Sequence, residues 1–316
     1  MSKIPASVRW LLSAILFLFV LTVISFLIVA LAPGDAAMSM LNMDTVSVTR
    51  SDIEALRNEL GLNDPLPVRY VRYVNDLMHG SLGNSLMTGK PVVEEIAKAW
   101  PYTQLLALWT LLLVVVLAFG LAALAARYAN TWVDRAVGVF TAASAAMPSF
   151  WLALLLIDLF AVKLGWLPSS GMKDPRGLIL PVVTLAIAII APYVKILRDS
   201  FVEASNANFV RSLRSRGVPE AIIGYKHILR DSLIPLITLL GVSLGSLLGG
   251  TIVIEVTFGI PGVGKLAIEA LARRDYGIIQ GFILIVGIIV FVINALIDLA
   301  YRLLDPALSH KAGVKA

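Results

Sequence analysis

A glycine-rich run that ends in lysine, from Gly259 to Lys265, has residue types that could bind phosphate. It fits the spacing G-x-x-x-x-G-K, in which backbone N–H groups and the lysine contact phosphate oxygens. Two features argue against that chemistry. Leu266 stands where a Ser or Thr would hold Mg²⁺, and the run follows an apolar helix, not a strand. We therefore interpret it as a tight loop between two membrane helices, in which Pro261 and the glycines fix the turn.

Three polar residues lie within apolar stretches, where an ionisable group costs free energy and is a candidate functional residue. Asp158 is the deepest, and we predict that it lines a pore or hydrogen-bonds a neighbouring helix. Asn294 and Asp298 share a later stretch. Asp298 lies near the end of that stretch, where an ion pair with Arg302 four residues on is the simpler interpretation.

No group of residues predicts a metal centre or an enzyme. The chain has no cysteine, which excludes disulfides and thiolate metal sites. Its three histidines, His79, His227 and His310, lie in separate segments. No nucleophile, base and oxyanion donors occur together. We predict that this chain has no catalytic residue, no metal site and no cofactor of its own.

The helices that position these residues are predicted to lie in lipid. Hydrophobic residues make up 58% of the 316 residues, charged residues only 15%, and the mean hydropathy is +0.86. About 20 apolar helical residues cross a bilayer. The sequence therefore predicts an all-α membrane protein with six transmembrane helices, at roughly 10–31, 102–126, 136–162, 178–194, 232–254 and 278–301. The first is too long for a secretory signal and is interpreted as a retained helix.

Lys and Arg are denser in the connections that follow even-numbered helices and at both ends of the chain, which predicts that both termini are cytoplasmic. The net charge of +5 then reflects topology and not nucleic-acid binding. The predicted domains are the N-terminus with the first helix (1–32), an external subdomain with two amphipathic helices (33–100), a core of five helices (101–305) with a cytoplasmic loop (195–231), and a cytoplasmic tail (306–316).

The long cytoplasmic loop predicts two short helices joined at a glycine. Asn208 can cap a basic helix, Gly217 suits a left-handed stop, and Pro219 suits the first turn of the next helix. Arg211 and Arg214 share one surface of the first helix. Basic residues beside apolar ones are common in protein interfaces, so we interpret this loop as a docking surface for a cytosolic partner; an ordinary positively charged loop is the alternative.

One helix, 232–254, has a smooth face. Gly241, Gly245 and Gly249 recur every four residues, so a neighbouring helix can approach closely. Helix packing is the default interpretation, and a pore-facing interface with a partner membrane subunit is the functional one.

The loop 195–231 resembles the EAA-type loop of ABC importer permeases, and its run from Phe209 to Val218 resembles the dipeptide/oligopeptide/nickel branch of that family. The likeness extends over nearly the whole chain. Further motifs that carry it are Pro33-Gly34-Asp35, Leu60 to Leu66, Gly80 to Ser85, Met147 to Trp151, Phe258 to Gly264 and Arg274-Asp275-Tyr276.

This resemblance implies a type I ABC importer permease in the bacterial inner membrane, which works by alternating access. Its implied partners are a second homologous permease, two ATPase subunits that hold ATP and Mg, an extracytoplasmic solute-binding protein and membrane lipid, without nucleic acid. The residues implied for coupling to the ATPases are Glu203, Ala204, Arg211, Arg214, Arg216, Gly217 and Glu220. Those implied for an external gate are Glu255, Phe258, Pro261, Gly262 and Asp275.

The cargo that the resemblance implies is a peptide or a related small solute. Nickel or a metal chelate carried by the same machinery is the alternative, with opines and glutathione as further members of the range. A secondary transporter is the rival from another class, and it would require ionisable relays and inverted repeats at the membrane midplane.

Overall fold

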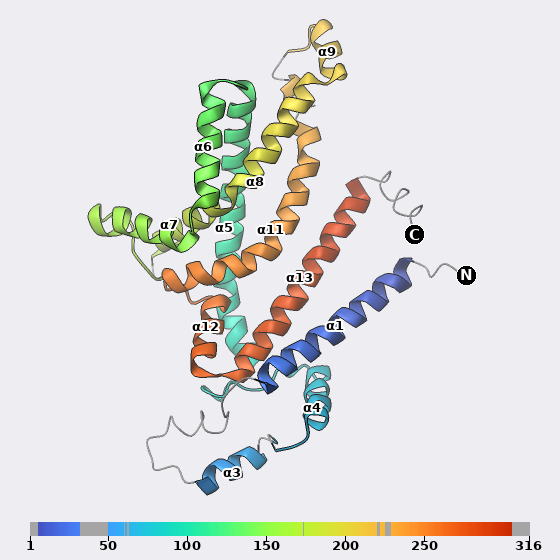
Figure 1. Cartoon of the computed structure of the whole chain (residues 1–316), viewed down its shortest axis with the longest axis vertical. Helices are drawn as coiled ribbons and strands as arrows, with labels where there is room; N and C mark the ends of the chain where they lie inside the picture. Colours follow the sequence, from blue (N-terminus) through green and yellow to red (C-terminus); the bar gives the residue numbers. More distant parts are fainter. Residues whose placement is uncertain are drawn as a thin grey trace. The chain divides into compact units, whose positions relative to one another are not determined.

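Helices form nearly all of the regular structure in this computed structural model, which describes residues 6–31, 50–59, 61, 63–172, 174–219, 222–224 and 229–304. The chain divides into two compact units (Figure 1). The first is Met1–Pro101 with Lys265–Phe291, and the second is Tyr102–Gly264 with Val292–Ala316. The break at Pro101 lies beside the predicted domain boundary at residue 100. The sequence did not predict that 265–291 would group with the N-terminal part.

In the first unit, α1 (Ala6–Ala30) contacts the helix α4 (Leu66–Met78), which belongs to the predicted external subdomain. The Tyr70 hydroxyl on α4 lies 3.0 Å from the Thr22 hydroxyl on α1. The Tyr73 hydroxyl on α4 lies 2.9 Å from the Ser25 hydroxyl on α1. Burial raises the pKa of the Tyr73 phenol, so this group stays protonated at neutral pH. Both helices predicted for this subdomain are present, the other being α3 (Arg50–Glu59).

The same unit contains α12 (Val263–Arg273) from Lys265 onward, and α13 (Tyr276–Leu304) as far as Phe291. The helix α13 packs on α1, since the Phe17 and Phe291 rings stack with centroids 4.9 Å apart. A Cβ atom at Gly287 would come within 2.6 Å of the Leu21 side chain, so the missing side chain permits this close approach.

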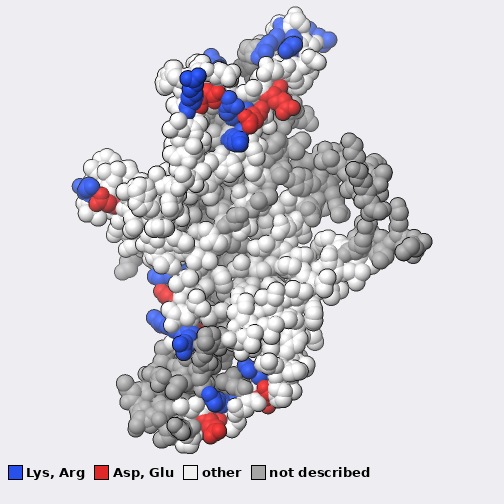
Figure 2. All heavy atoms as spheres, viewed as in Figure 1, with Lys and Arg blue, Asp and Glu red and all other residues white. Residues whose placement is uncertain are grey.

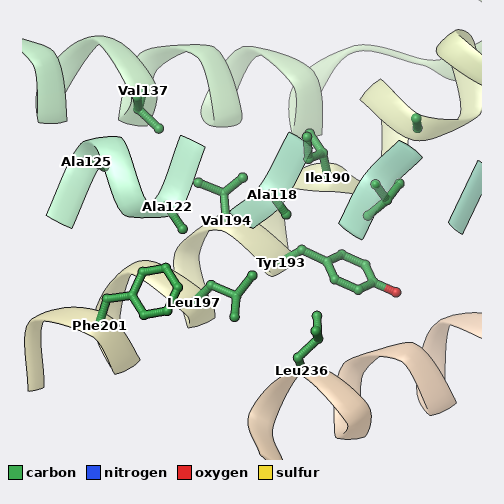
Figure 3. Packing of buried hydrophobic residues seen from close by; sticks show 12 residues of the cluster. Ala118, Ala122, Ala125, Val137, Ile190, Tyr193, Val194, Leu197, Phe201 and Leu236 are labelled. Atoms are coloured by element: carbon green, nitrogen blue, oxygen red, sulfur yellow. The ribbon is translucent and has the colours of Figure 1, made fainter. Parts of the chain in front are cut away.

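In the second unit, α8 (Ile179–Asn206) is the central helix. It packs against α6 (Trp132–Ala146), α7 (Ser149–Leu156) and α11 (Leu229–Thr257). Figure 3 shows small alanines of α5 (Val92–Arg127) facing the larger side chains of α8. Tyr193 and Leu197 of α8 are fully buried in this core. This burial explains why the sequence of α8 is apolar although it contains prolines.

Within the described part of the chain, four helical segments are long and apolar enough to cross a membrane: Trp10–Ala30, Val92–Arg127, Pro175–Asn206 and Tyr276–Ile297. A fifth arises if α6 and the segment Ser149–Lys163 count as one bent span. The remaining predicted span lies within the 29-residue helix α11. On the face of the second unit that Figure 2 shows, charged side chains gather around the joined ends of α5 and α6 and over α9, and one further ion pair lies beyond α7.

The third predicted span is not one straight helix, and that expectation was wrong. The two halves bend by 105° at Met147 and Pro148. Met147 is extended, with φ −88° and ψ 123°, because a residue that precedes proline is sterically kept out of the helical region. After α7 the segment continues as a π-helix, η1 (Ile157–Lys163).

The fourth predicted span is longer than the sequence indicated. Its helix begins after a short 3-10 turn, η2 (Pro175–Leu178), and continues to Asn206, whereas the apolar stretch ends near Val194. Residues 195–206 were therefore wrongly predicted as part of a loop. Phe201 and Ala204 are buried against the core, so packing extends this helix beyond its apolar run.

Candidate functional site

The gate loop, residues 258–264, joins α11 to α12 and is folded tightly against its own unit. Gly259 has φ +63°, and the Ile260 N–H donates to the Glu255 carbonyl at 2.8 Å. The Gly171 N–H donates to the Phe258 carbonyl at 2.8 Å. Phe258 and Ile260 are buried in an apolar cluster. The predicted tight turn is confirmed, and Pro261 is the exposed residue at its tip.

Glu255 is the central polar group beneath this loop, and its residue is fully buried. The Thr103 hydroxyl donates to Glu255 Oε1 at 2.7 Å, and the Val263 N–H donates to the same hydroxyl at 2.9 Å. A Cβ at Gly264 would lie 2.9 Å from Glu255 Oε2, and one at Gly262 would also strike the carboxylate. A buried carboxylate requires such hydrogen bonds, so Glu255 ties α5, α11 and the loop together.

The sequence analysis missed Thr103. It is a single hydroxyl residue at the start of a long apolar stretch, and such residues are too common in membrane helices to be a signal by themselves. Only the three-dimensional approach of α5 to Glu255 identifies its role.

Asp275 was predicted to belong with the gate residues, but it lies in the other compact unit. Its buried carboxylate accepts hydrogen bonds from the Ser85 hydroxyl and, at 3.0 Å, from the Leu86 N–H. It also accepts from the Ile278 N–H at 3.3 Å and so caps α13. Asp275 therefore fixes a loop of the predicted external subdomain to the start of α13. Ser85 ends one of the family motifs, but its partner was not predicted from the sequence.

The coupling segment, residues 208–219, follows α8 directly. Ala207 occupies the N-cap position of its helix α9 (Asn208–Ser215), so Asn208 is the first helical residue and not the predicted cap. Val210 is fully buried, while Phe209 is 42% exposed. The three arginines that were predicted to couple to the ATPases are all exposed. They are Arg211, Arg214 and Arg216.

Gly217 ends α9 in the predicted left-handed conformation, with φ +75°. The Val218 N–H donates to the Leu213 carbonyl at 3.1 Å, and the Gly217 N–H donates to the Arg214 carbonyl at 3.0 Å. These two bonds form a Schellman motif, which satisfies carbonyl groups at the end of the helix. The Ile222 and Ile223 N–H groups then donate to the Pro219 carbonyl, so a new turn starts at that proline, as predicted.

Two other predicted coupling residues lie on α8 and not in a loop. Glu203 is exposed and Ala204 is buried. Glu220 lies outside the described residues.

Asp158 has a neighbour that the sequence analysis overlooked. Its carboxylate pairs with Lys163 Nζ at 2.6 Å, and both side chains are exposed in this chain. Residues five apart become neighbours because this segment is a π-helix, with i to i+5 spacing. A role for Asp158 in the pore remains a prediction.

The remaining predicted positions lie on α11 and α13. At Gly241 a Cβ would come within 2.6 Å of Ile297, so α13 packs closely there. At Gly245 and Gly249 a Cβ would meet nothing within 4 Å, so close packing within the described chain accounts for only the first glycine. Asn294 is exposed, and the side chain of Asp298 lies outside the described residues. Among the residues searched, no three His, Asp or Glu side chains are grouped as metal ligands would be.

Comparison with known proteins agrees with these features. A family model described as "Binding-protein-dependent transport system inner membrane component" matches residues 102–310, and a model of the N-terminal part of such components matches residues 5–107. Permease proteins GsiC of glutathione transport systems from Escherichia coli K12 and Pectobacterium atrosepticum are each 34% identical over 304 residues, which cover 96% of this chain and 98% of theirs.

Two solved transporters share the fold. The methionine ABC transporter MetNI in an inward-facing conformation aligns with a TM-score of 0.57 and 16% identity, over 66% of this chain and 96% of that one. An amino acid ABC transporter crystallised with histidines aligns with a TM-score of 0.53 and 17% identity, over 66% and 94%. The chain therefore belongs to the binding-protein-dependent transport system inner membrane components and is a permease subunit of an ABC importer.

Proposed function

We propose that this permease forms one half of the translocation path for small peptides, with glutathione as the first candidate. The observation that carries the proposal is the 34% identity to glutathione permeases, which extends along 96% of the chain and includes the gate loop and the coupling segment. No particular observation favours nickel, so nickel and its chelates serve as competing cargo in the test.

The proposed partners are a second homologous permease, two ATPase subunits that bind ATP and Mg, and an extracytoplasmic solute-binding protein. The coupling segment suits contact with the ATPases, because exposed arginines and the exposed Phe209 ring lie on a short helix anchored by Val210. Exposed cationic and aromatic side chains together are typical of protein interfaces. This chain contributes no catalytic residue to ATP hydrolysis.

Alternating access requires that motion at the coupling segment reach the gate loop. The helix α8 continues into the coupling segment, and it packs along α11, which leads into the gate loop. We therefore propose that ATP binding displaces α9, that α8 carries this displacement to α11, and that the gate loop responds.

Transport into proteoliposomes tests this function. The complete complex is reconstituted with its binding protein and supplied with tritiated glutathione, a tritiated dipeptide or ⁶³Ni²⁺, with and without enclosed ATP. ATP-dependent uptake of glutathione or the dipeptide is expected. Uptake of ⁶³Ni²⁺ alone would overturn the peptide assignment, and uptake driven by a proton gradient without ATP would indicate a secondary transporter.

The topology is tested separately with introduced cysteines, because the native chain has none. Ser81 and Ser212 are both exposed. An impermeant thiol reagent added to intact cells, with the outer membrane permeabilised, is expected to label Ser81→Cys but not Ser212→Cys. The reverse pattern would contradict the proposal that both termini and the coupling segment are cytoplasmic.

A further inference from the structure

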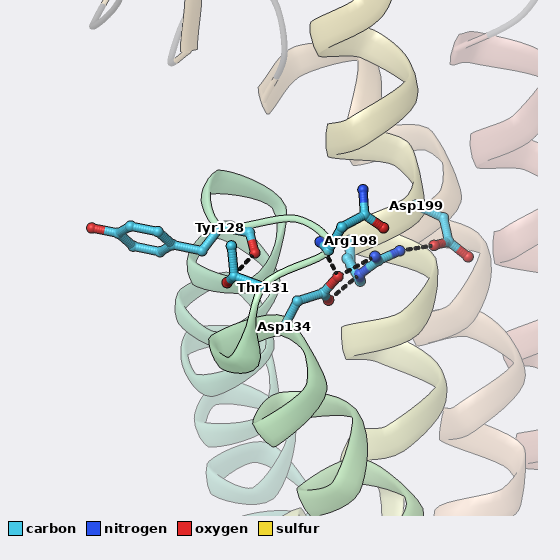
Figure 4. Close-up of polar contacts among 6 residues, drawn as sticks. Tyr128, Thr131, Asp134, Arg198 and Asp199 are labelled. Atoms are coloured by element: carbon cyan, nitrogen blue, oxygen red, sulfur yellow. Dashed lines mark hydrogen bonds and ion pairs between the residues drawn. The ribbon is translucent and has the colours of Figure 1, made fainter.

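An arginine on α8 forms a bidentate ion pair with an aspartate on α6. Arg198 Nε donates to Asp134 Oδ1 at 2.7 Å, and Arg198 Nη2 donates to Asp134 Oδ2 at 2.6 Å (Figure 4). Such parallel bonds fix orientation as well as distance. The third guanidinium nitrogen, Nη1, donates to Asp199 at 2.9 Å.

The aspartate is itself held in place by the turn that joins α5 to α6. The Asn130 N–H donates to Asp134 Oδ2 at 2.9 Å, and Asn130 adopts a left-handed conformation with φ +65°. The Thr131 hydroxyl donates to the Tyr128 carbonyl at 2.6 Å in the same turn. The turn therefore holds the carboxylate in place independently of the arginine.

This pair differs from four exposed ion pairs of the described residues, which join groups at most eight positions apart: Asp64 with Arg72, Glu94 with Lys98, Asp158 with Lys163 and Asp174 with Arg176. Asp134 and Arg198 are 64 positions apart, and their side chains are only 12% and 29% exposed. Water screens a pair less when it is partly buried, so this contact is expected to be stronger than a surface pair.

The pair lies between the apolar core and the coupling segment. Val137, Leu197 and Phe201 of the core are within one turn of it along α6 and α8. Two turns beyond Arg198, α8 ends and α9 begins, and Arg214 Nη1 of α9 donates to the Ser205 carbonyl of α8 at 3.3 Å. A displacement of α9 therefore reaches Arg198 through a short, hydrogen-bonded path.

We propose that Asp134 and Arg198 are a positioning pair that makes the α5–α6 turn move with the coupling segment during transport. This inference rests on the proposed function of that segment. It assigns to the α5–α6 hairpin a part in the ATP-driven motion, although Asp134 lies 64 residues from Arg198 in sequence and the hairpin carries none of the predicted coupling residues.

Paired spin labels test this motion. Tyr128 and Ser212 are exposed, and cysteines at these positions are the only ones in the chain. In the full complex we expect one narrow distance distribution between the labels, the same with and without ATP and vanadate. Arg198→Met is expected to broaden it and to lower transport at least about fivefold while ATP hydrolysis continues, since interacting sites typically couple by that factor or more.

Three further variants complete the test. Arg198→Lys keeps the charge but loses the two-pronged geometry, so an intermediate result is expected. Asp134→Asn with Arg198→Met removes both charges of the pair, leaves only the exposed Asp199 without its arginine and should broaden the distribution as the single variant does. Arg176→Met breaks only the exposed pair with Asp174 and should change neither measurement.

An unchanged distribution, or full transport, in Arg198→Met complexes that co-purify intact would overturn the proposal. The labelled parent complex separates this outcome from failure of the proposed function. If the parent does not transport, the proposed function fails, while the label distances still report whether the pair joins the two segments.

Discussion

The gate loop and the coupling segment are both short connections built around a left-handed glycine, but the chain encloses one and leaves the other open. At Gly262 and Gly264 of the gate loop an added Cβ would collide with Glu255 or Ile252. At Gly217 of the coupling segment an added Cβ would meet no atom of the described residues within 4 Å, although φ is +75°. One loop is thus constrained by packing and the other by backbone conformation alone.

This difference indicates where each connection obtains its shape. The gate loop is fixed by the buried Glu255 and Thr103, so changes there are expected to destabilise the fold. The arginines of the coupling segment are exposed, so changes there are expected to affect association with a partner. Four substitutions test this contrast.

Glu255→Ala is expected to have the largest effect on stability. It removes the acceptor of the Thr103 hydroxyl and leaves a cavity, which together cost about 3 kcal/mol or more. Equilibrium unfolding in mixed micelles measures this loss. Glu255→Gln keeps an acceptor oxygen and should lose less. Equal stability of Glu255→Ala and the parent would refute the view that Glu255 holds the gate loop.

Gly264→Ala should be the next most harmful. Its Cβ would lie 2.7 Å from Ile252 Cγ1 and 2.8 Å from Ile252 Cα, and a backbone atom cannot easily move away. Overpacking of this kind costs about 1–3 kcal/mol. The matched control is Gly249→Ala on α11, where the added methyl meets open space and alanine favours the helix. A control as unstable as Gly264→Ala would show that packing is not the cause.

Gly217→Val should leave the fold intact but impair coupling. The strain of a β-branched residue at positive φ is about 1–3 kcal/mol. It arises at a glycine where an added Cβ would contact no atom of the described residues within 4 Å. Subunits should still co-purify, while transport falls and ATP hydrolysis no longer responds to loaded binding protein. Gly217→Asn is the control, because asparagine tolerates this conformation and should retain transport. Normal transport by Gly217→Val would remove the coupling role from this residue.

Lys265→Ala should have the smallest effect. The lysine faces Glu269 at 3.7 Å on α12, so its loss should change stability by no more than about 0.5 kcal/mol. ATP affinity of the complete complex, measured with a fluorescent nucleotide, should be unchanged. A large loss of affinity would revive the interpretation of residues 259–265 as a phosphate-binding loop.

Features determined by local sequence were predicted well. The helices α3 and α4 and the left-handed stop at Gly217 depend on neighbours within a few residues, and all are present. The apolar stretches likewise marked where the long helices occur. Family motifs indicated the gate loop and the coupling segment, and the gate role of Asp275 stays a prediction.

Features that depend on contacts between distant segments were missed. The extension of α8 to Asn206 results from packing against the core, and the hydrogen bond of Thr103 to Glu255 joins residues 152 positions apart. The bend at Met147 is an exception, because Pro148 was visible and its steric effect on the preceding residue is general. The bend was not predicted because the sequence around Pro148 is uniformly apolar.

The length of α8 has a mechanical consequence. Its 28 residues rise by 1.5 Å each, so the helix is about 42 Å long, while the hydrocarbon layer is about 30 Å thick. The excess of about 12 Å is a rigid arm outside the lipid, with the coupling segment mounted at its tip. Pro192 interrupts the hydrogen-bond ladder within the same helix and supplies a point about which that arm can pivot. In the proposed mechanism, a displacement of the tip would rotate the part of α8 on the far side of Pro192.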